Sequence, residues 1–436
     1  MAQKVGLYCF TTDLRLHDQP ALAKAVGEVD ELICLYCRPH AWDQHSSKMT
    51  APLSTPRQTF LNQSIAELDQ QLAQLNQCLW IADNDQATLQ SLITTSGVTD
   101  VYISQQFGWF ERQVWQTLRQ DMPQLHIHEI GTHTLFDQSN LPFEIEAMPR
   151  GFSGVRGKLE KATHNAPIVK ITTLPPPPKQ QSIQPGLSAV DKSIGSTANH
   201  TSPEHQFVGG ELSGLKHLAD YLASGAASTY KQTRNALHGT HYSSKFSPWL
   251  ANGNLSVRQV VADLKQYEAS HGANESTYWI YVELLWREYF QWYAMRHGEK
   301  LYQFAGAQNK SLDYQNRSDL IDSWIQGQTD HPLVNACMTE LRLTGFLSNR
   351  GRQIVASCLV NELEQDWRYG AAYLEQALID YDVATNWGNW QYIAGAGPTT
   401  VNKRHFNLDK QVAQFDPQQQ YTNYWLEHNV MPPNND

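Results

Sequence analysis

The chain has 436 residues, 41% of them hydrophobic, and a formal net charge of −10 at neutral pH. This length predicts two or three domains, and no apolar run is long enough to span a membrane. The acidic balance argues against indiscriminate binding to polyanions, although a local basic groove can still contact a few phosphates. Six cysteines in so long a chain do not make a disulfide framework, so we expect a reducing, cytoplasmic environment.

The first 130 residues alternate short apolar strands with helices. Strands are expected over 4–10, 31–37, 79–83, 100–107 and 126–131, and helices over 20–26, 57–75 and 87–97. Alternation at these lengths predicts a parallel α/β sheet that binds ligands at the carboxyl ends of its strands. Cys34 and Cys37 have the spacing of a redox motif, but they end an apolar run and are expected to be core residues.

A change of composition separates this region from the rest of the chain. From Leu174 the sequence PPPPKQQSIQPGLSAVDKSIGSTANHTSPEH has no apolar period, which predicts an extended linker. Beyond Gly210 helices are expected over 211–224, 256–270, 276–297, 318–326, 331–345, 350–366 and 369–380. We therefore predict an α/β domain over 1–130, a linker over 131–205 and an all-α domain over 206–436.

The stretch from Thr344 to Tyr392 places polar residues in an apolar, Trp-rich context. One face of an expected helix carries residues at positions i, i+3, i+4 and i+7: Asn349, Arg352, Gln353 and Ala356. Asp380 and Asp382 follow, and then an expected turn of Asn386, Gly388 and Asn389 that includes Trp387 and Trp390. Burying these groups is costly unless they pair with one another or with a polar ligand. The alternative is a surface helix with ordinary polar residues.

Two further segments carry polar groups of the same kind. The aromatic helix expected over 279–292 contains Glu283 and Arg287 at i, i+4. They could form a simple helical salt bridge worth ~0.3–0.5 kcal/mol, but in so apolar a segment we expect a buried pair with a further polar partner. Serines between Ser243 and Ser247 precede a helix and suit an anion such as a pyrophosphate, although plain turn chemistry is the alternative.

These motifs together resemble the flavin-binding core of the photolyase/cryptochrome family, most closely its cryptochrome-DASH branch. The resemblance is carried by TGFLSNRGRQ, DWR, GAAYLEQALIDYD and ATNWGNWQY between Thr344 and Tyr392. DLRLHDQPAL near the N-terminus also resembles the family's first strand-to-helix turn, so the similarity covers most of the chain. It implies a Rossmann-like antenna-binding α/β domain followed by an all-α domain that binds FAD.

The resemblance also implies which residues would hold FAD. One half of the site would comprise Tyr230, Ser243, Ser244, Lys245, Phe246, Ser247, Glu283 and Arg287. Lys245 and Phe246 stand where the family commonly has Arg and Leu. The other half would comprise Asn349, Arg352, Asp380, Asp382 and Asn386, with Arg352 paired to Asp380. A cation and amides near the flavin ring stabilise its reduced, anionic form.

A second set of residues is implied to contact DNA that carries a damaged base. Glu283 would face the flipped lesion, and Trp286 would stack against it. Gln353 and Tyr392 stand where photolyases of duplex DNA usually have Met and Trp, as in the DASH branch, whose members prefer single strands. Stacking on Trp286 and Tyr392 would supply ~1–3 kcal/mol per base, and a single strand avoids the cost of flipping a base out of a duplex.

Three aromatic residues match the family's electron-transfer chain. Trp390 and Trp367 correspond to its inner and middle tryptophans, and Tyr314 stands in the place of the outer one. A tyrosine can end such a chain only if its proton also leaves. Core packing is the alternative for each of them.

Phosphate contacts and an antenna complete the implied sites. Candidate DNA phosphate contacts are Arg234, Arg350, Lys403 and Arg404. Glu111 falls where the family's folate-binding glutamate would sit, which makes 5,10-methenyltetrahydrofolate the candidate antenna. A solvated glutamate favoured by the helix dipole is the alternative at that position.

We therefore expect a cryptochrome-DASH-type flavoprotein and enzyme. It would use blue light and reduced FAD to split cyclobutane pyrimidine dimers, mainly in single-stranded DNA, without a metal. The alternative is a signalling photoreceptor that binds FAD and nucleic acid but repairs nothing. Gln353, and the lack of a His beside the Asn349–Gln353 motif, argue against a duplex cyclobutane or (6-4) photolyase.

Overall fold

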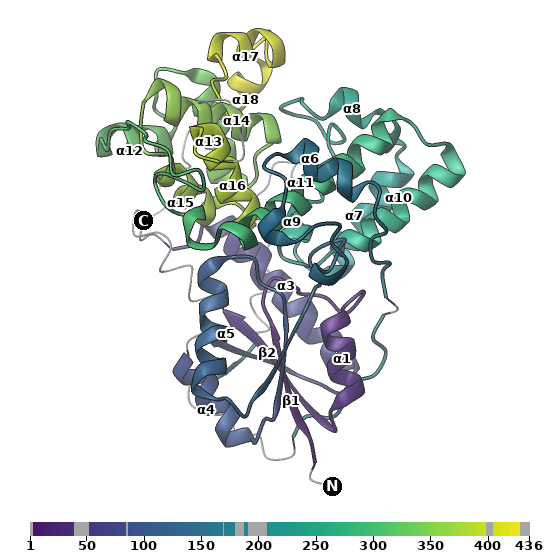
Figure 1. Cartoon of the computed structure of the whole chain (residues 1–436). Helices are drawn as coiled ribbons and strands as arrows, with labels where there is room; N and C mark the ends of the chain where they lie inside the picture. Colours follow the sequence, from purple (N-terminus) through teal and green to yellow (C-terminus); the bar gives the residue numbers. More distant parts are fainter. Residues whose placement is uncertain are drawn as a thin grey trace, which may run out of the picture.

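The computed structural model describes residues 3–38, 52–83, 86–168, 170–178, 187–190, 207–397 and 404–427. Figure 1 shows a domain built on a sheet, which contains the N-terminal part of the chain, and a helical domain stacked on one end of it. The predicted fold class is therefore confirmed. Within the described residues, no helix is both long and apolar enough to cross a membrane.

The N-terminal domain is a six-stranded sheet in the order β5-β4-β1-β2-β3-β6. Its strands are β1 Val5–Phe10, β2 Glu31–Arg38, β3 Leu79–Asp83, β4 Asp100–Ser104, β5 His126–Ile130 and β6 Ser188–Ala189. The first five are parallel, as predicted. The two-residue β6 pairs antiparallel with β3 and comes from the segment expected to be only a linker.

Helices cover both faces of this sheet. They are α1 Pro20–Glu28, α3 Thr55–Gln74, α4 Gln86–Ser96 and α5 Trp109–Asp121, of which α5 was not predicted. Because side chains alternate along a strand, Tyr8 packs with α1 and α3 while Leu7 packs with α4 and α5. Cys34 and Cys37 are fully buried in these two different clusters, which confirms that they are core residues.

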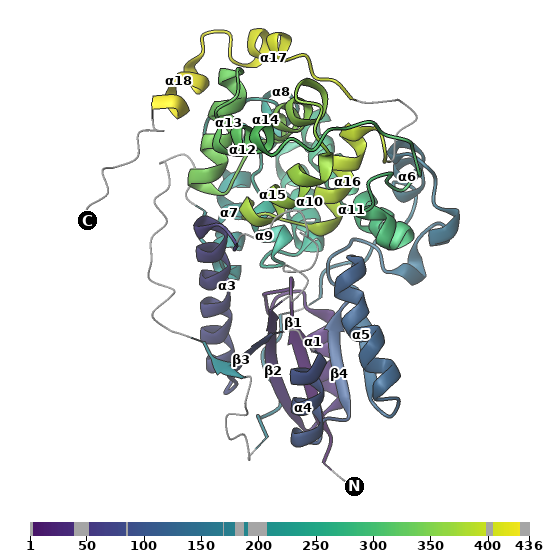
Figure 2. The same cartoon turned by 90° about the vertical axis from the view of Figure 1, so that its left-hand side faces the viewer.

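The C-terminal domain is helical throughout its described part. Its longer elements are α7 Glu211–Ala223, α8 Tyr230–Thr233, α9 Ser247–Ala251, α10 Val257–His271, α11 Glu275–His297, α12 Ser318–Gln326, α13 Pro332–Thr344, α14 Asn349–Ser357, α15 Trp367–Ala377, α16 Val383–Ala394, α17 Leu408–Phe415 and α18 Gln420–Glu427. Short turns are η1 Gln138–Asn140, η2 Ile145–Ala147, η4 Ala226–Thr229, η5 Gly298–Leu301 and η6 Cys358–Glu362. In Figure 2 the long α3 rises beside the sheet to the lower edge of this domain, where it packs against α7 and α15.

Two expectations about individual segments are wrong. The turn expected at Asn386–Asn389 is the interior of α16, because Asp382 caps the helix by accepting from the Thr385 amide and Gly395 ends it in a left-handed conformation. The helix expected over 350–366 is interrupted by the π-helical turn η6 and ends before α15 begins.

The interval 131–205 is also not a linker along its whole length. It contains a further helix, α6 Phe152–Leu159, which packs against α11. Met148, Phe152, Val155 and Leu159 are buried in the core of the helical domain. Within α6, Phe152, Val155 and Leu159 are spaced by three and four residues, as in a helix that faces a core, so the signal was present in the sequence. Residues 170–178 form no helix or strand, and 179–186 and 191–206 lie outside the described residues.

The loop after β1 joins the two domains through buried charges. Arg15 donates to the carbonyl of Gly253, at 2.8 Å, and to that of Thr132, also at 2.8 Å. Asp18 forms a 2.9 Å ion pair with Arg258, and the side chains are 0% and 3% exposed. Asp18 also accepts from the Ser256 hydroxyl. Removing one member of such a pair leaves a buried charge without compensation.

We therefore expect Asp18→Ala to lower the free energy of unfolding by about 3–5 kcal/mol. The matched control is Asp220→Ala, which breaks an exposed pair with Lys216 whose side chains are 62% and 76% exposed. That change should cost at most about 1 kcal/mol. Urea denaturation of both variants measures the difference, and equal effects would contradict the role given to the buried pair.

Candidate functional site

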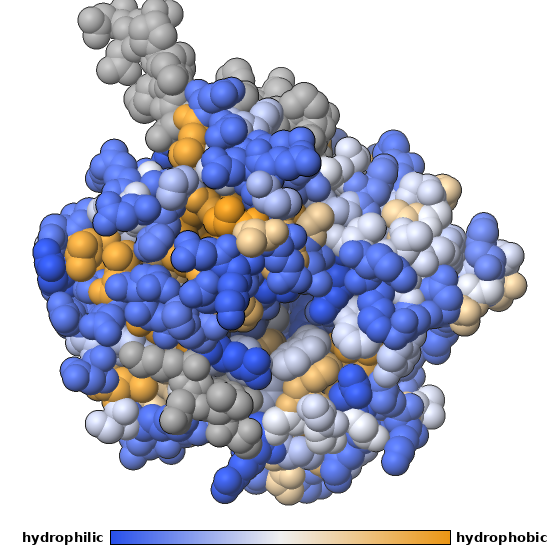
Figure 3. Space-filling view, turned by 90° about the horizontal axis from the view of Figure 1, so that it is seen from above, coloured by the Kyte–Doolittle hydropathy of each residue, from blue (hydrophilic) through white to orange (hydrophobic). Residues whose placement is uncertain are grey.

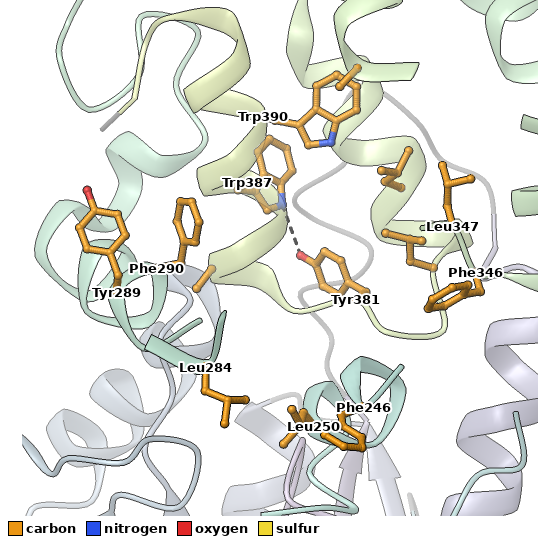
Figure 4. Close-up of a cluster of buried hydrophobic side chains, with 14 of the residues drawn as sticks. Phe246, Leu250, Leu284, Tyr289, Phe290, Phe346, Leu347, Tyr381, Trp387 and Trp390 are labelled. Carbon is orange, nitrogen blue, oxygen red and sulfur yellow. Dashed lines mark hydrogen bonds between the residues drawn. The ribbon is translucent and has the colours of Figure 1, made fainter. Parts of the chain in front are cut away.

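A cavity of about 490 Å³ lies within the helical domain. This volume falls within the range of roughly 300–1,000 Å³ that is usual for ligand pockets. Figure 3, which views the helical domain from above, shows a hollow near the middle of this face with hydrophilic residues along much of its rim. Figure 4 shows apolar side chains that line the cavity from separate elements, including Phe246, Leu284, Phe346 and Trp390.

The fold brings most of the predicted site residues to this one cavity. Those that line it are Tyr230, Arg234, Ser243, Ser244, Lys245, Phe246, Ser247, Glu283, Trp286, Arg287, Asn349, Arg352, Gln353, Asp380, Asp382, Asn386, Trp390 and Tyr392. They come from stretches of chain more than 150 residues apart, on α8, α9, α11, α14 and α16 and the loops beside them. Glu111, Tyr314, Arg350, Trp367 and Arg404 do not line it, and Lys403 lies outside the described residues.

The pairing predicted for Arg352 is present. Its guanidinium lies 2.7 Å from Asp380, whose side chain is 1% exposed, and its Nε donates to the Leu347 carbonyl at 2.9 Å. Asn386 donates to the carbonyl of Ala371 at 3.0 Å. These contacts fix the polar wall of the cavity before any ligand enters.

The simple Glu283–Arg287 salt bridge is not what the structure contains. Glu283 pairs with Arg234, which the sequence had offered as a phosphate contact. Arg287 instead lies 3.7 Å from Asp382 and donates to the carbonyl of His133, which precedes the helical domain in the chain. Burial raises the pKa of Glu283, and the Arg234 guanidinium opposes this shift. Glu283 therefore holds its proton to a higher pH than an exposed glutamate does.

Trp286 is supported from behind by a residue that the sequence reading missed. The rings of Trp286 and Phe152 are stacked, with centroids 3.7 Å apart and planes inclined by 14°. Phe152 begins α6, inside the interval predicted to be a linker, and Arg156 lies over its ring at 5.8 Å. The aromatic wall is thus two rings thick.

The three aromatic residues of the predicted electron path differ in position and exposure. Trp390 lines the cavity, and its ring packs on Gly370 of α15. Trp367 begins α15, is fully buried, and donates to the carbonyl of Phe304 at 3.1 Å. The rings of Phe304 and Tyr314 are 6.0 Å apart, and Tyr314 is partly exposed. Phe304 thus connects Trp367 to Tyr314, and the electron path from Trp390 through Trp367 stays a prediction.

Two of the proposed phosphate contacts lie at the margin of the site. Arg404 lies over the Tyr392 ring at 4.7 Å, so it stands directly beside the cavity. Arg350 is held away from it, over Phe415 at 4.4 Å, and donates to Asn235 at 3.1 Å. Of this pair, only Arg404 contacts a residue that lines the cavity.

Glu111 lies apart from the large cavity. It lines a second, smaller cavity between the domains, of about 60 Å³, and burial raises its pKa to about 7. This burial argues against the solvated-glutamate alternative. The role of Glu111 in binding a folate antenna stays a prediction.

The large cavity does fit FAD. Two buried acceptor atoms on its wall, Gln353 Oε1 and Asp380 Oδ1, have no hydrogen-bond partner within the described residues. Buried acceptors of this kind are normally satisfied, and the flavin and adenine rings of FAD carry N–H donors that could bond them. Arg287 and the serines from Ser243 to Ser247 supply polar groups on another side of the same cavity.

Comparison with known proteins agrees with this geometry. Residues 6–179 match the family model described as DNA photolyase, and residues 279–433 match that of the FAD binding domain of DNA photolyase. Cryptochrome DASH of Vibrio parahaemolyticus is 45% identical over 98% of this chain and 94% of its own length. Cryptochrome DASH of Idiomarina loihiensis is 44% identical over 97% of this chain and 92% of its own.

A solved structure points the same way. The crystal structure of a cryptochrome from Synechocystis sp. superposes with a TM-score of 0.89 at 34% identity, covering 98% of this chain and 90% of that one. Sheet, helical domain and cavity thus define a flavoprotein of the photolyase type, with an FAD-binding helical domain. More narrowly, the chain belongs to the cryptochrome DASH family.

The close packing of Gly370 on Trp390 gives a test of the cavity wall. A Cβ at Gly370 would overlap the Trp390 ring, so we expect Gly370→Ala to displace this ring, destabilise the fold by about 1–3 kcal/mol and weaken FAD retention. Gly157→Ala on α6 is the control, because a Cβ there meets nothing within 4 Å. Thermal unfolding and the FAD content of the purified variants measure both effects. Full FAD content in the first variant would show that the ring can move without cost.

Proposed function

We propose that this protein splits cyclobutane pyrimidine dimers in DNA, mainly single-stranded, under blue light. The observation that carries the proposal is the joining, in one cavity, of a polar wall suited to FAD with the aromatic pair Trp286 and Tyr392. When bound and reduced, FAD supplies an electron on absorbing blue light. The relatives named cryptochrome DASH, and a solved class III photolyase from Agrobacterium tumefaciens with a TM-score of 0.82 at 25% identity, support the proposal.

The aromatic residues would bind the damaged bases. Trp286 lines the cavity and is packed by the rings of Phe152 and Phe290, and Tyr392 is covered on one side by Arg404. Both rings are therefore held in place before substrate arrives, which reduces the entropy lost on binding. Stacking of a base against such a ring is worth about 1–3 kcal/mol.

Polar side chains would orient the lesion. Glu283 and Arg234, which form an ion pair on the cavity wall, would lie beside the lesion. The Arg234 guanidinium can donate a hydrogen bond to a pyrimidine carbonyl, whose oxygen gains charge when the base accepts an electron. The unpartnered Gln353 Oε1 can accept from a base N–H. A methionine in place of Gln353 would present a largely apolar surface, because its sulfur is only a weak hydrogen-bond acceptor.

Single strands suit this site because two of the proposed phosphate contacts already have protein partners within the described residues. Extruding a paired base costs a few kcal/mol. Of the four proposed phosphate contacts, Arg234 is engaged by Glu283 and Arg350 is packed on Phe415.

The second candidate function is light signalling. It is favoured by the predicted path from Trp390 through Trp367 to Tyr314, which would serve reduction of FAD rather than repair.

The test uses purified protein with reduced FAD under anaerobic conditions. Ultraviolet-irradiated oligothymidylate, single-stranded or annealed to oligoadenylate, is exposed to blue light or kept dark, and remaining dimers are counted. We expect light-dependent loss on the single strand and at least tenfold less on the duplex. Glu283→Gln removes the negative charge that holds Arg234 in place, so it should lower the yield per absorbed photon. Absence of repair on both substrates, with FAD bound and reducible, would overturn the proposal in favour of signalling.

Gln353→Met tests the substrate preference separately. We expect this variant to lose affinity for the damaged single strand by about 1–2 kcal/mol, the worth of one hydrogen bond in a buried site. Its FAD content is measured beside the affinity, because Gln353 also lines the FAD cavity. Gln391→Met is not a suitable control, because that side chain holds the carbonyls of Lys300 and Leu301. Gln326→Met is the suitable control, because Gln326 lies at the end of α12 and does not line the cavity. Equal affinities of wild type and Gln353→Met would remove Gln353 from the recognition set.

A further inference from the structure

Trp387 lies beside the proposed electron path but is not one of its three members. It stands three residues before Trp390 on α16 and is 1% exposed. Its ring meets that of Trp367 edge-on, with centroids 5.9 Å apart, and that of Tyr302 at 4.9 Å. Trp387 is therefore an indole in direct ring contact with the middle tryptophan of the path.

The N–H of Trp387 is bonded to a buried carboxyl group. Its Nε1 donates to Glu375 Oε2 at 3.0 Å and to the Tyr381 hydroxyl at 3.3 Å. Figure 4 shows the bond between Trp387 and Tyr381, which lie next to the cavity. Glu375 belongs to α15 and is 2% exposed. A buried carboxyl group on an indole N–H is the geometry needed to take up a proton from the ring.

We propose that Trp387 and Glu375 form a proton-coupled electron donor that branches from Trp367. The proposal rests on the electron path of the proposed function, in which a light-excited oxidised flavin is the oxidant and Trp390 and Trp367 are oxidised in turn. It assigns roles to two residues that the path itself does not use.

The step balances in atoms, electrons and charge. One electron passes from the Trp387 ring to the oxidised Trp367 ring, which returns to its neutral form. An indole that has lost an electron is a strong acid at its N–H, and this proton moves to Glu375 Oε2. The products are a neutral Trp387 radical and a neutral carboxylic acid. A cation and an anion are thus replaced by two neutral groups, which favours the products in a site where charge is costly to bury. When the electron and the proton return to Trp387, the ring and the carboxylate of Glu375 are back in their original states.

The step requires Glu375 in its ionised form. Burial raises the pKa of Glu375 to about 8, so at lower pH the carboxyl already holds a proton and cannot accept another. The charged and titratable groups that face it come from several elements: Arg57 on α3, Glu111 on α5, Tyr302 after η5, and Tyr381 before α16. Arg57 favours the ionised form and Glu111 opposes it. The ionised fraction of a group with a pKa of about 8 rises about tenfold between pH 7 and pH 9.

The experiment uses the full chain with oxidised FAD, excited by a blue flash between pH 6.5 and pH 9.5. Transient absorption and electron paramagnetic resonance distinguish neutral from protonated tryptophan radicals. In wild type we expect the yield of the neutral radical to rise about tenfold from pH 7 to pH 9, following Glu375. Glu375→Gln keeps an acceptor for the indole N–H but cannot take the proton, so it should remove the rise. Trp387→Phe should remove the signal itself.

A second buried pair provides the matched control. Trp292 donates to Glu288 at 2.8 Å, and burial raises the pKa of Glu288 to about 7. The ring of Trp292 contacts Phe107, not a member of the path. Glu288→Gln should therefore leave the radical yield and its pH profile unchanged. Glu111→Gln should keep the rise and shift it to lower pH, because it removes a neighbour that raises the pKa of Glu375.

The outcomes separate this proposal from the path on which it rests. A neutral radical of unchanged yield and pH profile in both Glu375→Gln and Trp387→Phe would overturn the proposal. The Trp390→Phe variant tests the path itself. Loss of flavin photoreduction in this variant would show that the path operates, and continued photoreduction would show that the path is wrong. If Trp387→Phe does not fold, the isosteric Glu375→Gln variant alone decides whether the proposal holds. The absorbance of FAD bound to this variant shows that its cavity is intact.

Discussion

The structure depends on buried ion pairs that cross from one domain to the other. Asp18 and Arg258 lie almost wholly out of water, and each compensates the other's charge. Because Arg15 also donates to Gly253, the loop after β1 sets the position of the segment that leads from α9 to α10. Gly253 has a left-handed backbone, and any side chain there would collide with the carbonyl of Thr12. The position of one domain relative to the other is therefore fixed both by the buried ion pair and by close backbone contact.

The same principle organises the cavity. Its polar side chains are mostly engaged before a ligand binds: Arg352 with Asp380, Glu283 with Arg234, and Arg287 with Asp382. A preorganised wall of this kind loses little entropy on binding. The few acceptors left without partners among the described residues, on Gln353 and Asp380, then determine what the ligand must supply.

Much of the fold and most of the cavity could be predicted from the sequence. Strand–helix alternation gave the parallel sheet, and the i, i+3, i+4 spacing of Asn349, Arg352 and Gln353 placed these residues on one wall. Local patterns failed where tertiary packing overrides them. Asn386–Asn389 has the composition of a turn, but a capped helix forms because Trp387 and Trp390 must both be buried. Partners on other elements were equally hidden: nothing near Glu283 in the sequence points to Arg234, and nothing near Trp286 points to Phe152.

The position of Phe152 has a consequence for how the chain can be divided. The family model for FAD binding covers residues 279–433, yet the cavity also takes residues from 230–251, and Trp286 rests on a ring from α6. Arg287 is held by the carbonyl of His133, which lies earlier still. Cofactor binding is thus not a transferable module. A fragment cut at the boundary of sequence similarity would lose one wall of its own pocket, and exchange of the helical domain between relatives must carry the segment from residue 133 onward with it.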